Sequence, residues 1–236
     1  MFNPKKQRET WEQKLVDRLV EFEPPPSLCS CCQTVSSFRI YGFPPRLNAR
    51  CPRCGSLERH RLVILYLQKN PHLLTSRDVL HFAAEDTVRK YVAGRAGRYT
   101  AGDLNPADGD LRLNIEAIDL PDNSVDTVIC SHILEHVDDH AALKEIFRIL
   151  RPGGTALLLF PLIEGWETTF EDPSIVAPEE RLRFFGQEDH VRFFGRDVRD
   201  RISNMGFKLS EFTAVEPDIQ EYGLKRGEKI FLSEKI

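Results

Sequence analysis

The stretch NSVDTVICSHILEHVDDHAALKEIFRILRPGGTALLLF, residues 123–160, decides the fold of this chain. Residues 125–130 form a β-branched run, which is typical of a strand that is buried on both faces. An amphipathic helix with an acidic start follows, and we expect the Pro-Gly-Gly turn at 152–154 to end it before a second buried strand over 155–160. The pattern predicts one half of a nucleotide-type α/β sheet, in which ligands bind at the carboxyl ends of the strands.

This block resembles the second half of the class I S-adenosylmethionine-dependent methyltransferases, of the type 11 kind. In that family an acidic-start strand, an LEH loop and a helix ending in R-x-L-(R/K)-P-G-G recur. The resemblance covers about residues 78–236. It implies a Rossmann-like sheet of seven strands in the order 3-2-1-4-5-7-6, with strand seven antiparallel and residues 208–212 and 229–233 as the last two strands.

A narrower resemblance joins the two ends of the chain. The segments CPRCGSLERHR (51–61), VLHFAAE (79–85) and ETTFEDPSIVAPEERLRFFGQEDHVRFFGRDVRDRISNMGF (167–207) are similar to a bacterial methyltransferase group that carries a cysteine-rich N-terminal ribbon. Members of that group have a similarly glycine-poor HFAxE loop. The resemblance indicates the class of reaction more firmly than the substrate.

The composition is that of an ordinary soluble protein, with 41% hydrophobic residues and a net charge of -4 over 236 residues. This charge indicates neither a nucleic-acid nor a membrane partner. No apolar run approaches the length of a membrane span, and the first residues contain no apolar signal core. We therefore expect a cytoplasmic protein, and the sequence leaves its oligomeric state open.

Four of the six cysteines form two C-x-x-C pairs, Cys29 with Cys32 and Cys51 with Cys54, separated by 18 residues. This spacing in a reducing compartment predicts a structural zinc ribbon with four thiolate ligands. Disulfides, free core thiols or iron are the alternatives. Cys31 is an alternative ligand to Cys32, and we expect the sixth cysteine, Cys130, to lie in the core.

The chain is predicted to fall into four parts. Residues 1–26 would form an amphipathic helix and a proline linker, and residues 27–57 the zinc ribbon. A connecting helix would occupy 58–76, and the methyltransferase domain 77–236. Within that domain, an insertion at about 162–195 is rich in charged groups and is the expected substrate pocket.

The resemblance also implies which residues bind S-adenosylmethionine. His81 stands at the acidic position of the first loop, and Ala83 and Glu85 stand where glycines are usual. Asp103 would hold the ribose hydroxyls, although it could instead be a turn residue. The full set of expected cofactor residues is His81, Ala83, Glu85, Asp103, Leu104, Asn114, Ile115 and Ser131.

Methyl transfer requires an aligned acceptor and often a base that removes its proton. Histidine suits that role near neutral pH. The candidates are His190 in the insertion, then His132, with His136 third. Each of them could instead make a structural hydrogen bond.

The leading interpretation is an S-adenosylmethionine-dependent methyltransferase that acts on an oxygen or nitrogen of a small molecule or sugar. Two others stay open: an RNA or protein methyltransferase that uses the ribbon for docking, and a non-catalytic scaffold. Five arginines near the second cysteine pair could bind phosphate or RNA, but such a run is more often a solvated face. They are Arg46, Arg50, Arg53, Arg59 and Arg61.

Overall fold

The structure, a computed structural model, describes residues 24–42, 44–105 and 107–236. The predicted N-terminal amphipathic helix lies outside these residues. The chain divides into two compact units. The ribbon unit comprises the described residues up to Gln68 together with Ala214–Glu228, and the sheet unit comprises Lys69–Thr213 together with Lys229–Ile236.

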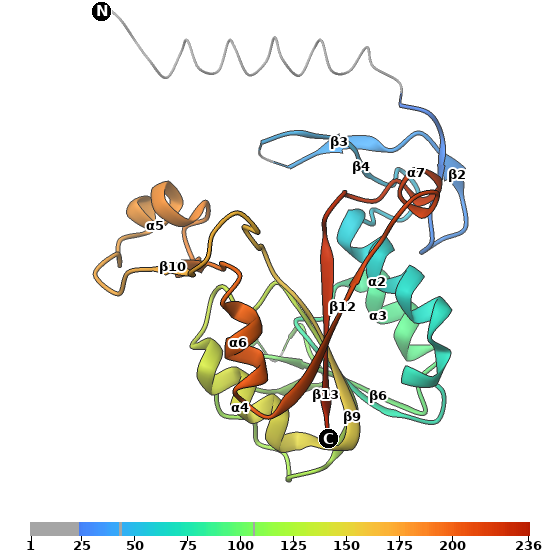
Figure 1. The fold of residues 1–236 in the computed structure, drawn as a ribbon. Coiled ribbons are helices and arrows are strands. Elements are labelled where there is room, and N and C mark those ends of the chain that lie inside the picture. Colours follow the sequence, from blue (N-terminus) through green and yellow to red (C-terminus); the bar gives the residue numbers. More distant parts are fainter. Residues whose placement is uncertain (1–23, 43, 106) are drawn as a thin grey trace, which may run out of the picture. The chain divides into compact units, whose positions relative to one another are not determined.

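The sheet unit is built on a seven-stranded sheet in the order β12-β13-β9-β8-β5-β6-β7 (Figure 1). β13 runs antiparallel to both of its neighbours, and the other pairs are parallel. Read from β7, this is the order that the resemblance implied. The strands are β5 (Asp78–Phe82), β6 (Arg98–Asp103), β7 (Leu111–Arg112), β8 (Val125–Ser131), β9 (Leu150–Leu159), β12 (Phe207–Thr213) and β13 (Lys229–Lys235).

The main hydrophobic core lies on one face of this sheet. Alternate residues of the central strands, such as Leu80 and Val128, pack there against apolar residues of α4 and α6. Figure 1 shows both helices on this side. Cys130 belongs to the same core, as expected. The helices are α3 (Asp86–Ala93), α4 (Asp139–Ile149) and α6 (Val198–Ser203), and a short 3₁₀ helix, η1 (Pro71–Leu73), precedes β5.

The turn after α4 differs from the prediction. The helix ends at Ile149 and β9 begins at the next residue, so the Pro-Gly-Gly sequence lies inside the strand. The pairing of β8 with β9 shifts register here, as a β-bulge does. Gly154 suits this bulge because a Cβ there would lie 2.8 Å from the Arg151 carbonyl oxygen and 2.9 Å from that of Asp126. The bulge thus allows the strand to follow the helix without a separate loop.

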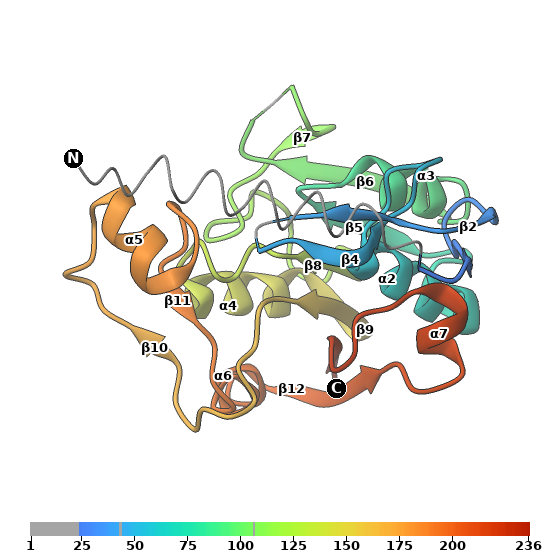
Figure 2. The ribbon, with the colours of Figure 1, turned by 90° about the horizontal axis from the view of Figure 1, so that it is seen from above.

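The insertion between β9 and β12 has secondary structure of its own. β10 (Phe170–Glu171) pairs antiparallel with β11 (Arg192–Phe193), and α5 (Pro178–Phe185) lies between them in the chain. Figures 1 and 2 both place α5 and β10 beside α4 and α6 and away from β6. The insertion therefore extends the side of the sheet unit that carries the main core.

The ribbon unit contains two short hairpins and two helices. Its strands are β1 (Ser27–Leu28), β2 (Val35–Ser36), β3 (Arg39–Tyr41) and β4 (Arg46–Arg50), paired antiparallel as β1 with β2 and β3 with β4. The helices are α2 (Glu58–Lys69) and α7 (Asp218–Tyr222). The connection between β12 and β13, which carries α7, thus belongs to this unit rather than to the unit of its flanking strands.

One fully buried arginine, Arg61, links the β12–β13 connection to the rest of the ribbon unit through hydrogen bonds. Its guanidinium also lies 4.2 Å from the centre of the Phe38 ring, close enough for a cation–π contact. Burial lowers the pKa of Arg61, but five carbonyl oxygens accept its hydrogen bonds and so offset the loss of water. Those carbonyls belong to Asn48, Ala49, Ser56, Tyr222 and Gly223.

Candidate functional site

The register of the parallel strands gathers the expected cofactor residues at one edge of the sheet. Phe82, at the end of β5, pairs with Gly102 of β6 and with Cys130 of β8. The segments that begin at Ala83 and at Leu104 therefore leave the sheet side by side, and so does the loop that begins after Ser131. This carboxyl edge is where open α/β sheets bind their ligands.

The loop after β5, Ala83 to Glu85, contains no glycine, but its backbone adopts a conformation that favours glycine. Ala83 has a φ of 45°, in the left-handed region, and its N–H donates to the Gly102 carbonyl at 2.9 Å. His132, at the corresponding place after β8, has a φ of 56°. Both residues follow a strand that ends at the same edge. Strain of this kind concentrates at functional sites, so these two turns agree with the expectation of a ligand site at this edge.

Two other expected residues flank the first loop. His81 is buried inside the sheet unit, with its Nδ1 3.1 Å from the Tyr99 hydroxyl oxygen. Burial raises the pKa of that hydroxyl, which keeps it protonated. Glu85 is the residue before α3, so the loop leads into a helix N-terminus. A helix N-terminus near a ligand is the feature that the glycine-rich form of this loop also provides.

The end of β6 and the segment after it contain four of the expected residues. The Asp103 carboxylate accepts a hydrogen bond from the Asn105 N–H at 2.8 Å, which is the turn role that the sequence left open. A carboxylate has about four acceptor sites, so this bond leaves capacity for a ribose. Leu104 and Asn114 are exposed. Ile115 is buried in the core, so only its backbone is available to a ligand.

Glu135, in the LEH loop, is the centre of a cluster that includes the candidate bases. Its side chain is only 1% exposed, and its Oε1 lies 3.0 Å from Nδ1 of His132. Because a carboxylate only accepts, His132 Nδ1 carries the proton and Nε2 is left as the basic nitrogen. The His132 side chain is 30% exposed. Sequence reasoning missed Glu135, for which the LEH motif was the available signal.

His190 reaches the same cluster from the insertion. It is 3% exposed, and its Nδ1 lies 3.0 Å from the Phe185 carbonyl oxygen. Its ring packs edge-on against that of His136, with the centres 4.6 Å apart. Burial, followed by the neighbouring His136, lowers the pKa of His190. The structure therefore brings His132, His136 and His190 together around Glu135, but it exposes His132 far more than His190.

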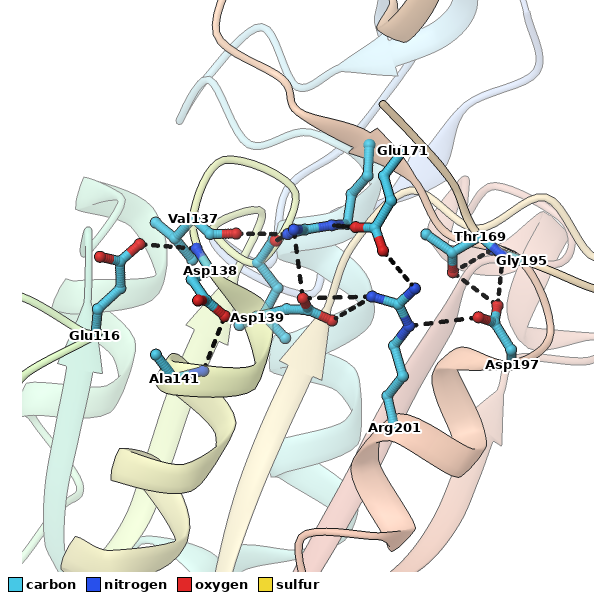
Figure 3. Close-up of polar contacts among 12 residues, drawn as sticks. Glu116, Val137, Asp138, Asp139, Ala141, Thr169, Glu171, Gly195, Asp197 and Arg201 are labelled. Carbon is cyan, nitrogen blue, oxygen red and sulfur yellow. Dashed lines mark hydrogen bonds and ion pairs between the residues drawn. The ribbon is translucent and has the colours of Figure 1, made fainter. Parts of the chain in front are cut away.

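A network of charged side chains holds the insertion in place (Figure 3). Arg192 of β11 donates to the carbonyl oxygens of Leu134 and Val137 in the LEH loop. It also pairs with Asp139 at the start of α4 and with Glu171 of β10. Arg201 of α6 pairs with the same two carboxylates and with Asp197. This network fixes the strand that follows His190.

In the ribbon unit, the four predicted cysteines meet. Their sulfur atoms all lie within 4.8 Å of one another, and Cys31 is not in the group. Cys29 and Cys54 are 3.7 Å apart, and Cys32 and Cys51 are 3.8 Å apart. Sulfur atoms on a tetrahedral zinc ion, with Zn–S bonds of about 2.3 Å, are about 3.8 Å apart. The donor set therefore fits zinc, and all four cysteines are free of disulfides.

The arginines near the cysteines do not form one solvated patch. Arg61 is the buried residue described above, and Arg46 forms a bidentate pair with Glu58. Arg50 lies over the Tyr41 ring at 5.2 Å. At least Arg46, Arg50 and Arg61 thus have partners within the protein, which weakens the alternative of a phosphate-binding surface.

Residues 87–158 match the family model described as a methyltransferase domain. A curated relative, the methyltransferase tpcM of Aspergillus fumigatus, is 34% identical over 109 residues, which are 43% of this chain and 30% of that protein. The chain spans about a fifth of the length of two further curated relatives.

Solved methyltransferase structures share the fold. The 1,6-didemethyltoxoflavin-N1-methyltransferase of Burkholderia thailandensis, solved with S-adenosylhomocysteine, has a TM-score of 0.51 at 16% identity, covering 75% of this chain and 77% of that one. An S-adenosylmethionine-dependent methyltransferase of Mesorhizobium loti also has a TM-score of 0.51, at 14% identity, covering 73% and 97%. Identities this low show the fold alone.

Among the described residues, no helix is both long and apolar enough to cross a membrane.

Proposed function

We propose that the protein is an S-adenosylmethionine-dependent methyltransferase that acts on an oxygen or nitrogen of a small molecule or sugar. The observation that carries this proposal is the carboxyl edge of the sheet, where two left-handed turns, Asp103 and the His132–Glu135 pair meet within the matched fold. The methyltransferase domain match supports the class of reaction. The charged insertion supports a hydroxylated or cationic acceptor.

In this proposal the cofactor lies along the carboxyl edge and supplies an electrophilic methyl group. The Asp103 carboxylate would accept from the ribose hydroxyls, and Asn114 with the backbone of Ile115 would contact the adenine. The loop from Ala83 to Glu85 would allow close approach of the chain. Leu104 and Ser131 would contact the cofactor from the neighbouring strands. The buried His81 would hold the first loop in position.

The acceptor group must lose its proton as it gains the methyl group. His132 is the better-placed candidate base, because its basic Nε2 belongs to a partly exposed ring that Glu135 orients. His190, which the sequence ranked first, is buried and has its Nδ1 bonded to a carbonyl. We therefore place His132 first and assign His190 to a supporting role in the insertion.

The ribbon unit completes the proposal with one structural zinc ion on Cys29, Cys32, Cys51 and Cys54. The distances between the sulfur atoms support it. A centre closed by four thiolates contributes to folding rather than to the reaction. Its role would be to hold the two hairpins of the ribbon together.

Calorimetric titration of the zinc-replete protein with S-adenosylmethionine and S-adenosylhomocysteine tests the proposed function. We expect binding in the micromolar range, weakened at least tenfold by Asp103→Ala. The matched control is Asp119→Ala, which removes an exposed carboxylate and should leave binding unchanged. A folded protein that binds neither compound would contradict the proposal and favour the scaffold interpretation.

A further inference from the structure

Glu135, His136 and His190 form a second group of potential metal ligands, in the sheet unit. Each offers one donor atom, and the three donor atoms lie within 4.8 Å of one another. The proposed methyl transfer needs a base and a cofactor, but it does not require this grouping of three donors. Two histidines with one carboxylate are a common ligand set for divalent transition metals.

Two of these side chains each have one buried polar atom without a hydrogen-bond partner in the described part of the chain. The atoms are Glu135 Oε2 and His190 Nε2. The other polar atom of each side chain is satisfied, Oε1 by His132 and Nδ1 by the Phe185 carbonyl. Since a carbonyl only accepts, His190 Nδ1 is protonated and Nε2 presents a lone pair. Two buried acceptors in one cluster without a donor are unusual, and a bound cation would satisfy both of them.

The third side chain, His136, connects the cluster to the surface. It is partly exposed, and its Nδ1 lies 3.2 Å from the exposed carboxylate of Asp189. An Nδ1–H directed at Asp189 leaves Nε2 with the lone pair. Histidines that bind metals usually donate their other N–H to a carbonyl or a carboxylate, which fixes the ring. His190 has such a carbonyl and His136 such a carboxylate.

The surrounding structure holds the ligands in position. The Val191 N–H donates to the Glu135 carbonyl oxygen at 2.9 Å, so the residue after His190 is bonded to the LEH loop. Arg192 adds its bonds to the carbonyl oxygens of Leu134 and Val137. The insertion and the LEH loop are therefore joined next to the cluster, which limits the entropy lost when a metal binds.

We propose that Glu135, His136 and His190 bind one divalent transition metal ion, such as zinc or cobalt. Three protein ligands leave a coordination position for water or for a donor atom of a substrate. Because Glu135 also holds His132, the metal would share a ligand with the pair at the carboxyl edge. The proposal does not depend on methyltransferase activity, since metal binding is measured directly.

Cobalt titration of the full chain, with the ribbon first loaded with one equivalent of zinc, tests this site. We expect one further equivalent of Co²⁺ to bind, with visible ligand-field bands and without the near-ultraviolet thiolate charge transfer of a cysteine site. His136→Ala should weaken this binding by about tenfold or more, because it removes one of three ligands. His140→Ala, an exposed histidine of α4, is the matched control and should bind as the unaltered protein does.

Three results would overturn the proposal: no second equivalent, unchanged binding by a folded His136→Ala protein, or a spectrum with thiolate charge transfer. X-ray absorption of the cobalt-loaded, unaltered protein gives an answer that needs no variant. Only nitrogen and oxygen neighbours around cobalt would support the site. Sulfur neighbours would show that cobalt had entered the ribbon, and the proposal would fail.

Discussion

The cysteine group of the ribbon unit and the Glu135–His136–His190 group of the sheet unit both gather ligand atoms within 4.8 Å, but they are assembled differently. The cysteines come from two C-x-x-C turns, so their spacing alone predicts that they meet. His190 joins its partners only because the insertion folds back onto the LEH loop. The comparison teaches that sequence spacing reveals a site when short turns hold the ligands, and hides it when a distant segment supplies one.

The two groups also differ in what surrounds them. The cysteines are themselves much of their small core, which otherwise contains Phe38. The histidines border a large core made by the sheet, α4 and α6. We therefore expect the fold of the ribbon unit to depend on the proposed zinc ion, and the fold of the sheet unit to need no metal.

The largest expected effect is loss of the ribbon fold on removing a cysteine ligand. Cys32→Ser should release zinc and expose the ribbon unit to proteolysis, because structural zinc contributes on the order of 10 kcal/mol to the folding of such modules. Limited proteolysis with mass spectrometry measures this, and residues 78–213 should stay resistant. Cys31→Ser is the matched control and should keep its zinc, since Cys31 is outside the group. The reverse result would make Cys31 the ligand.

The next effect concerns Arg61, whose buried hydrogen bonds stabilise the ribbon unit without a metal. Arg61→Met should lower the free energy of unfolding by about 3–5 kcal/mol, because it leaves buried carbonyls without donors. Denaturant unfolding of the zinc-loaded protein measures the loss. Arg53→Met, at an exposed position of the same ribbon, should change stability little. Equal effects of the two changes would show that the hydrogen bonds of Arg61 contribute nothing specific.

A smaller effect is expected where the insertion joins the LEH loop. Arg192→Leu should cost about 2–3 kcal/mol and weaken cobalt binding, since it removes the bonds beside His190 while Arg201 still pairs with Asp139 and Glu171. Thermal unfolding and the cobalt titration measure the two effects. Arg196→Leu removes an exposed ion pair with Glu167 and serves as the control. Cobalt binding that survives Arg192→Leu intact would show that the ligands need no such support.

The smallest effect tests the glycine-poor loop. Ala83→Gly should raise stability by up to about 1 kcal/mol, because relief of the left-handed strain exceeds the added backbone entropy of the unfolded chain. Ala84→Gly, at a neighbouring position without a left-handed φ, should instead lower stability. Differential scanning calorimetry of the two variants measures the contrast. Destabilisation of equal size in both would mean that the φ of Ala83 carries no strain.

Much of the sheet was predictable because buried strands leave apolar runs in the sequence. The order of the seven strands agrees with what the family resemblance implied, and the four cysteines meet as their spacing predicted. The prediction that the Pro-Gly-Gly sequence forms a turn between the helix and the next strand was wrong, because this sequence lies in a bulge within β9. The assignment of Ala214–Glu228 to the ribbon unit could not be predicted, since it depends on long-range contacts, among them the bonds of Arg61 to Tyr222 and Gly223.

The roles at the candidate site were harder to predict than the fold. The sequence ranked His190 above His132, but the burial of His190 favours the partly exposed His132, and burial is not visible in a sequence. Glu135 was also missed, although the LEH motif offered a signal for it. Residue identity suggested histidine as a base, and only the folded chain shows which nitrogen is available.

Hydrogen exchange with and without S-adenosylhomocysteine tests most directly whether the carboxyl edge of the sheet is the cofactor site. The account predicts that the ligand slows exchange at residues 83–88, 103–105, 114–117 and 131–135, and leaves the amides of the ribbon unit unchanged. Protection confined to other segments, or none at saturating ligand, would contradict the account.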